Sequence, residues 1–165
     1  MKKIFSFLFA AMMLLSCNNA GVKTLVDLHH GQPMLVGLGT RKDLQQEPYV
    51  KWFKNQYDNY KLNKAYLDSL KGHNFSMVIV MATWCPDSRR EVPRMFKILD
   101  SLHYTGKVPV YYLDRHWKAG KYDPVKKYQI HRIPTFIIYV NGKEVGRIIE
   151  HPKKSLEIDL YQILK

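Results

Sequence analysis

The chain places a single cysteine at the junction of two predicted elements. Residues 75–83 form a nearly continuous apolar run, which is typical of a strand buried on both faces. Residues 86–103 carry apolar side chains on one helical face, and the proline that begins them suits a first turn. Cys85 therefore stands at a helix N-terminus, where unpaired N–H groups and the helix dipole favour the thiolate. Because the thiolate is the nucleophilic form of cysteine, this position predicts a reactive sulfur.

Polar side chains near Cys85 bear on that chemistry. Arg89 and Arg90 follow within one turn and add positive charge, while Asp87 opposes them. Ser88 lies three residues after the cysteine, near enough to donate a hydrogen bond to the sulfur. From the cysteine alone a second interpretation stays open, in which it is a small buried residue that ends a strand and does not react.

The other cysteine belongs to an N-terminal targeting segment. Lys2 and Lys3 precede an apolar run at residues 4–15, too short to span a bilayer comfortably but suited to a signal peptide. Residues 14–17, LLSC, resemble the lipobox of bacterial lipoproteins. The resemblance implies cleavage after residue 16 and a palmitate-type diacylglyceryl anchor on Cys17. An ordinary secretory signal with an incidental cysteine is the alternative.

The elements that must position Cys85 lie in the C-terminal three quarters of the chain. We divide the sequence into a signal peptide (1–16), a tether and irregular lead-in (17–46) and a folded domain (47–165). Glycines and a proline break up the lead-in, and aromatic spacing at 47–70 predicts helices divided near residues 62 and 63. Beyond the first strand and helix we expect a strand at 108–113, a short helix at 124–129, an Asn-Gly hairpin joining 135–140 to 144–149, and a helix at 155–164.

A second motif lies about 50 residues after Cys85. The segment YQIHRIPTF at residues 128–136, followed by the hairpin at Asn141-Gly142, resembles the cis-proline segment of thioredoxin. Together with Trp84-Cys85-Pro86, it identifies residues 75–165 as similar to the thioredoxin-like superfamily. The resemblance implies an α/β thioredoxin-like sandwich, a central mixed sheet flanked by helices, here with an N-terminal helical extension.

The resemblance also implies roles for individual residues. Cys85 matches the exposed cysteine that attacks a substrate disulfide, and the backbone of the residue before the cis-proline pairs with the substrate chain. Cys85-Pro86-Asp87-Ser88 looks like a Cys-Pro-Asp-Cys variant whose second cysteine is replaced by serine. The implied catalytic positions are Cys85 and Ser88, and the implied substrate-binding residues are Trp84, Pro86, Ile133, Pro134 and Thr135.

The serine decides which mechanisms stay open, because a hydroxyl does not resolve a mixed disulfide. With Cys17 acylated, the folded domain has one thiol and no internal disulfide. Three interpretations remain. Cys85 is a monothiol catalyst of mixed-disulfide reduction, deglutathionylation or isomerisation; the domain is a redox-inactive module that binds peptides or proteins; or Cys85 is a peroxide-reactive thiol.

Composition narrows the partners. The net charge of +12 comes from scattered lysines and arginines without an arginine-rich tail, so we expect no nucleic-acid binding. The histidines form no metal-ligand pattern, and we predict neither a metal nor a cofactor. The expected partners are disulfide-bearing or glutathionylated periplasmic proteins, an external thiol reductant, and a membrane reached through the lipid anchor. We therefore expect the protein in the bacterial cell envelope, facing the periplasm, with the outer membrane favoured.

Overall fold

A computed structural model of the chain describes residues 21–28 and 30–165. The predictions for the signal peptide, the lipobox and Cys17 lie outside these residues. The elements, in chain order, are β1 (Val22–Val26), β2 (Pro33–Gly39), α1 (Arg41–Leu44), α2 (Val50–Asn59), α3 (Lys64–Leu70), β3 (Ser76–Met81), α4 (Pro86–Ser101), β4 (Val110–Tyr112), α5 (Pro124–Tyr128), β5 (Thr135–Val140), β6 (Lys143–Ile149) and α6 (Leu156–Leu164). No helix within the described part of the chain is both long and apolar enough to cross a membrane.

The strands form one mixed sheet of six, in the order β1-β2-β4-β3-β5-β6. β3 and β4 are parallel and lie at the centre, and α4 makes the crossover between them. β5 pairs antiparallel with β3 and carries β6 on its other side. β1 and β2 form a second antiparallel hairpin, which joins the sheet where Leu38 lies opposite Tyr111.

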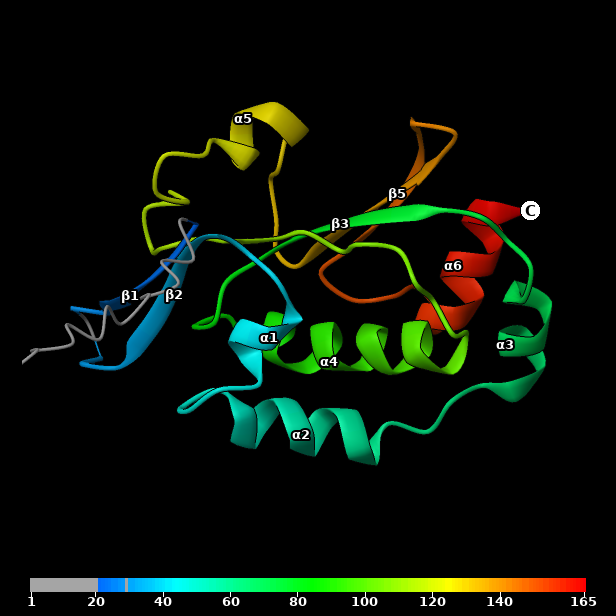
Figure 1. Cartoon of the computed structure of the whole chain (residues 1–165), viewed down its shortest axis with the longest axis horizontal. Helices are drawn as coiled ribbons and strands as arrows, with labels where there is room; N and C mark the ends of the chain where they lie inside the picture. The colour runs from blue at the N-terminus through cyan, green and yellow to red at the C-terminus, as the bar shows by residue number, and fades with distance from the viewer. Residues whose placement is uncertain (1–20, 29) are drawn as a thin grey trace, which may run out of the picture.

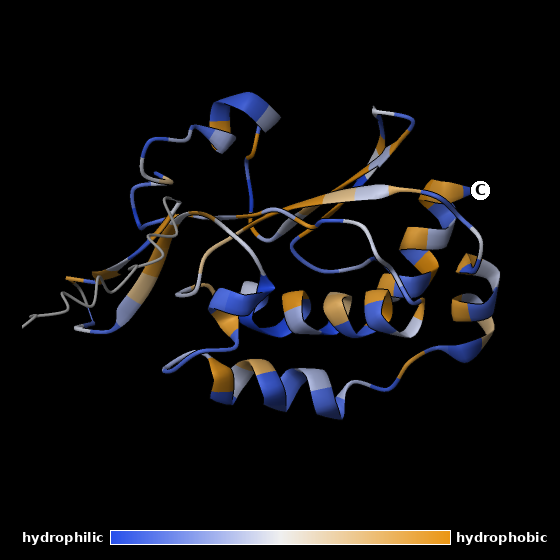
Figure 2. Cartoon of the chain, in the orientation of Figure 1, coloured by the Kyte–Doolittle hydropathy of each residue, from blue (hydrophilic) through white to orange (hydrophobic). Residues whose placement is uncertain are grey.

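Helices cover the two faces of this sheet unequally (Figure 1). α4 lies along one face of the sheet, and α2 packs on the outer side of α4. α3 and α6 lie side by side, near the C-terminus of the chain. The short α5 lies across the sheet from α4. Figure 2 shows β3 as an apolar strip, whereas α5 is mostly hydrophilic. The larger cluster of buried residues lies on the α4 face.

Alternation along the central strands builds a core on each face. Side chains of β3 point in turn to the α4 face (Met77, Ile79) and to the α5 face (Val78, Val80). The same period of two runs through β4 and β5, which explains why all three strands consist mainly of apolar and aromatic residues. Cys85 packs into the second, smaller cluster, with Ala119, Ile130 and Ile133 among its members.

The expected elements from residue 47 onward are confirmed, with ends shifted by a few residues. The aromatic segment divides into α2 and α3 around residues 60–63, and the Asn-Gly hairpin joins β5 to β6. Ser155 caps α6, since its hydroxyl accepts a hydrogen bond from the N–H of Ile158 at 3.2 Å. The thioredoxin-like α/β fold class is therefore confirmed.

The expectation of an irregular lead-in at 17–46 is wrong for the part that the structure describes. Residues 22–26 and 33–39 are strands, and Met34, Leu35 and Val36 are buried against the body. Glycine and proline made this stretch resemble a loop. Pairing with β4, far away in the sequence, overrides that local signal. The folded unit thus includes residues 22–39, which precede residue 47.

Candidate active site

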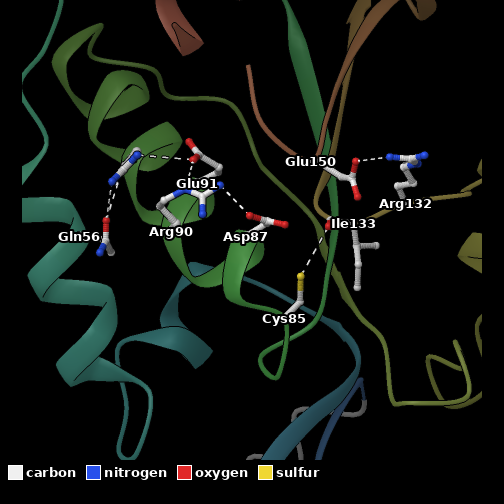
Figure 3. A network of polar contacts seen from close by, with 9 residues as sticks. Gln56, Cys85, Asp87, Arg90, Glu91, Arg132, Ile133 and Glu150 are labelled. Carbon is white, nitrogen blue, oxygen red and sulfur yellow. Dashed lines mark hydrogen bonds and ion pairs between the residues drawn. The ribbon is translucent and has the colours of Figure 1, made fainter. Parts of the chain in front are cut away.

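Cys85 occupies the position predicted for it, at the N-cap of α4. The turn between β3 and the helix is closed by the Cys85 N–H, which donates to the Ala82 carbonyl at 3.1 Å. The sulfur points across to the segment before β5, where Sγ lies 3.5 Å from the carbonyl oxygen of Ile133 (Figure 3). Two chain segments 48 residues apart therefore meet at this one sulfur.

The sulfur is less open than the resemblance implied. Cys85 keeps 8% of its surface exposed, so little of this residue is open to a partner. Only a protonated thiol can donate the bond to Ile133. When the sulfur is a thiolate, the Ile133 carbonyl is available to another donor, such as the N–H of an incoming chain.

Hydrogen bonds fix the segment before β5 that faces the sulfur. The Ile133–Pro134 peptide bond is cis, and both residues are buried. The Pro134 carbonyl accepts a hydrogen bond from the Glu150 N–H at 2.7 Å. The Thr135 hydroxyl donates to the Arg132 carbonyl at 2.7 Å. The Ile133 N–H has no acceptor among the residues that the structure describes, so this residue has an unused backbone donor as well as the carbonyl that lies beside the sulfur.

Ser88 does not make the hydrogen bond expected of it. Its side chain is fully buried, and its Oγ accepts from the Ala82 N–H at 3.3 Å. No hydrogen bond between Ser88 and the Cys85 sulfur occurs within the described residues. The hydroxyl instead satisfies a buried backbone donor just after β3, where a cysteine would be a weak acceptor.

Trp84 forms one wall of the site. Its indole Nε1–H donates to the Leu113 carbonyl, just after β4, at 3.0 Å. The Arg115 guanidinium lies over the Trp84 ring, with Cζ 4.7 Å from the ring centroid. The ring is therefore fixed in position from two sides. Pro86, at the first turn of α4, is exposed.

The charged side chains around Cys85 form two separate groups of ion pairs. Arg90 pairs with Asp87 at 2.6 Å and with the buried Glu91 at 2.5 Å, and Figure 3 shows these groups together on α4. Hydrogen bonds to these carboxylates raise the pKa of Arg90, led by the bond to Glu91. Arg132 pairs with Glu150 on the other side of the site. Arg89 is not part of either arrangement.

Two contacts between the β1–β2 hairpin and the residues around Cys85 also belong to the site, and the sequence did not predict them. Thr83 is buried, and its hydroxyl accepts from the Leu35 N–H in β2 at 3.2 Å. Asp27, only 2% exposed, accepts from the Arg115 guanidinium at 2.7 and 2.9 Å. A lone carboxylate directly after Leu25 and Val26 was the available signal. It could not show that the partner would lie 88 residues away.

No cluster of three histidine, cysteine, aspartate or glutamate side chains suited to a metal occurs in the part of the chain described by the structure. The groups around Cys85 are a thiol, backbone amides, an indole and guanidinium groups. This set can support nucleophilic attack by sulfur and can pair with an extended chain.

A mixed sheet in which a cysteine at a helix start faces a cis-proline segment defines a thioredoxin-like domain. A family model described as thioredoxin matches residues 41–161, which is most of the chain. The chain therefore belongs to the thioredoxin family.

Individual relatives are distant. Thioredoxin-2 of Pyricularia oryzae is 29% identical over 85 residues, which are 50% of this chain and 44% of that protein. The chain thus matches less than half of that relative's length. Among solved structures, oxidised thioredoxin O2 from Arabidopsis thaliana is 20% identical, with 62% of this chain and 86% of that one covered and a TM-score of 0.43. Trxlp from Edwardsiella tarda is 19% identical, with coverages of 64% and 95% and a TM-score of 0.41.

Proposed function

We propose that this protein carries out monothiol thiol–disulfide exchange through Cys85 and depends on an external thiol to complete each turnover. The observation that carries the proposal is the pairing of Cys85 Sγ with the Ile133 carbonyl, while the position three residues on holds a serine turned toward Ala82. The attacking sulfur and the surface for a substrate chain are kept, and the resolving sulfur is not.

The chemistry has two balanced steps. The Cys85 thiolate attacks one sulfur of a protein–glutathione or protein disulfide, so that a new S–S bond forms and the other sulfur leaves as a thiolate. An external thiol, or a second cysteine of the substrate, then attacks the mixed disulfide and releases Cys85. The first outcome reduces the substrate at the expense of the external thiol, and the second isomerises it. Ser88 takes no part in electron transfer.

The protein backbone supplies substrate alignment in this proposal. An extended segment that enters beside Trp84 meets the N–H and the carbonyl of Ile133, and the carbonyl becomes available as Cys85 loses its proton. Such pairing is the strand-addition mode of peptide recognition. Trp84 and Pro134 would then flank the substrate sulfur, and Pro86 and Thr135 border the same area.

The location is part of the proposal. We infer that residues 1–16 are removed and that Cys17 bears the lipid, which anchors the domain to the cell envelope, facing the periplasm and on the outer membrane. The support is the basic start, the short apolar run and the LLSC motif. Disulfides persist in that compartment, so substrates exist there. Incorporation of labelled palmitate into the chain, lost in Cys17→Ser, tests the anchor.

Turnover of a glutathionylated peptide with reduced glutathione as the second thiol tests the function. We expect the wild-type protein to deglutathionylate the peptide catalytically and Cys85→Ser to show only the background rate. The Cys17→Ser variant is the matched control, because it removes the other cysteine and leaves the site intact. Equal rates for wild type and Cys85→Ser would show that the sulfur is not a catalyst.

A redox-inactive peptide-binding module is the second candidate, and the low exposure of Cys85 is the observation that favours it. In that case the Ile133 backbone and the Trp84 wall would bind an extended chain without exchange. Capture of a substrate peptide that Cys85→Ser leaves unchanged would support this function over the first.

A further inference from the structure

A small hollow lies between the active-site turn, at Trp84 and Arg89, and the loop that links β1 to β2. Its volume is about 210 Å³, and it is lined by Asp27, His30, Gln32, Pro33, Met34, Trp84, Arg89 and Arg115. Trp84 belongs to both the hollow and the cysteine site. A group bound in the hollow would therefore be adjacent to a partner disulfide-bonded to Cys85.

One pair of charges in the hollow is already matched. Arg115 donates through Nε and Nη2 to the same oxygen of Asp27, which is buried, and it also lies over Trp84. His30 lies within 3.3 Å of that carboxylate. The Asp27–Arg115 pair fixes the wall of the hollow and contributes no net charge to it.

Arg89 is the remaining cation. Its backbone N–H donates to the Cys85 carbonyl at 3.0 Å, so it stands one turn along α4 from the cysteine. Its Nε donates to the Thr83 carbonyl, and its guanidinium lies 5.9 Å from the Trp52 ring centroid. These contacts orient the guanidinium but leave the N–H groups of both Nη atoms without an acceptor among the described residues.

An oriented guanidinium with two unused donor groups is suited to a carboxylate, because its N–H bonds match both oxygens. A hollow of 210 Å³ is smaller than the usual site for a whole small molecule, so it holds one charged group rather than a complete ligand. The remainder of that ligand would then extend toward the sulfur.

We propose that Arg89 binds a carboxylate of the thiol compound that exchanges with Cys85, and that the protein thereby prefers anionic disulfide partners. This inference rests on the proposed function and names the charge class of its substrate. The carboxylate belongs either to a small acidic thiol such as glutathione or to an acidic side chain beside a cysteine in a polypeptide. Both present the same group at the same site.

Rates of mixed-disulfide formation with three small disulfides test the proposal. The probes are dithiodiglycolate, which is anionic, hydroxyethyl disulfide, which is neutral, and cystamine, which is cationic. We expect the wild-type rate with the anionic probe to exceed that with the neutral one by about tenfold, the effect of one charge-assisted contact, and the rate with cystamine to be the slowest. In Arg89→Gln the ratio of anionic to neutral rates should fall to about one.

Arg132→Gln is the matched control, since it removes a nearby positive charge outside the hollow and should keep the ratio. If the ratio of anionic to neutral rates is unchanged in Arg89→Gln, or falls equally in both variants, Arg89 does not bind the carboxylate. Exchange with the neutral probe would still support the proposed function in that case. If no disulfide reacts with Cys85, both proposals fail. The two sources of the carboxylate are then distinguished by the effect of Arg89→Gln on two further rates. One is the rate with glutathione disulfide, and the other is the rate with a peptide disulfide that carries glutamate, rather than glutamine, beside its cysteine.

Discussion

The most informative single residue is Ser88, because it separates this site from a two-cysteine site. The sequence alone shows a serine three positions after Cys85, and it therefore predicts that the site has no resolving sulfur. Its actual contact, with the Ala82 N–H, was not predictable. That bond depends on how the turn after β3 folds back on α4, which no local pattern specifies.

Ser88→Ala should lower the free energy of unfolding by about 1–2 kcal/mol, because a buried N–H loses its acceptor. The rate of reaction of Cys85 with disulfides should stay near that of wild type, since the hydroxyl does not contact the sulfur. Urea denaturation and thiol kinetics measure the two effects. Loss of reactivity at unchanged stability would mean that the serine acts on the sulfur after all.

Ser88→Cys should create a dithiol site. The two cysteines would lie three residues apart at a helix start, the spacing that resembles Cys-Pro-Asp-Cys relatives. In a Cys17→Ser background, mild oxidation should reduce the number of free thiols from two to zero. The oxidised variant should then form no adduct with oxidised glutathione, because it has no free thiol. Thiol titration follows the change, and two thiols that persist after oxidation would contradict this geometry.

Among the elements, those with strong local periodicity were predictable and those that depend on distant partners were not. The helices α2, α4 and α6 show apolar side chains at helical spacing, and β3 is apolar after its first residue, Ser76. β2 has two glycines and a proline, and its strand conformation comes from pairing with β4. The same non-local pairing brings Leu35 to Thr83 and Asp27 to Arg115, which is why these contacts were missed.

Thr83→Val tests how closely β2 and the active-site turn are coupled. Loss of the Leu35 N–H to Thr83 Oγ1 bond should reduce the free energy of unfolding by about 1–2 kcal/mol, because the donor is buried. Valine keeps the volume and the branching, so packing changes little. Hydrogen exchange at Leu35 should accelerate, whereas exchange at Ile137, in the distant β5, should follow only the global change. Unaltered exchange at Leu35 would argue against the coupling.

For the whole molecule, the family match begins at residue 41, but the structure requires more of the chain. A protein that starts at Arg41 loses β1 and β2, together with the buried side chains of Met34, Leu35 and Val36. Three such side chains contribute on the order of 5 kcal/mol, comparable to the total stability of a small domain. We expect this variant to be largely unfolded by circular dichroism, whereas a chain from Gly21 should unfold cooperatively. A folded protein from Arg41 would make the hairpin dispensable.

Alkaline pH should also destabilise the whole molecule. Burial, followed by the hydrogen bond to Asp100, raises the pKa of Tyr57 from 10.0 to about 12, and burial and the bond to Tyr128 raise the pKa of Tyr111 to about 12. The unfolded chain releases these protons at lower pH than the folded one. The contribution of these two tyrosines to the free energy of unfolding is therefore fully present below pH 10 and is lost as the pH rises toward about 12. Unfolding measured across this range should show the decline, and it should be shallower in Tyr57→Phe. A flat profile would contradict the raised values.

The most direct test of the account is the intact mass of the protein after exposure to oxidised glutathione, in a Cys17→Ser background where Cys85 is the remaining cysteine. We predict the gain of one glutathione on the native protein, removed by added thiol, and no gain in a variant that also carries Cys85→Ser. A native protein that stays unmodified, while the urea-unfolded protein gains the adduct, would show that the fold shields the sulfur. Exchange chemistry at this site would then be excluded.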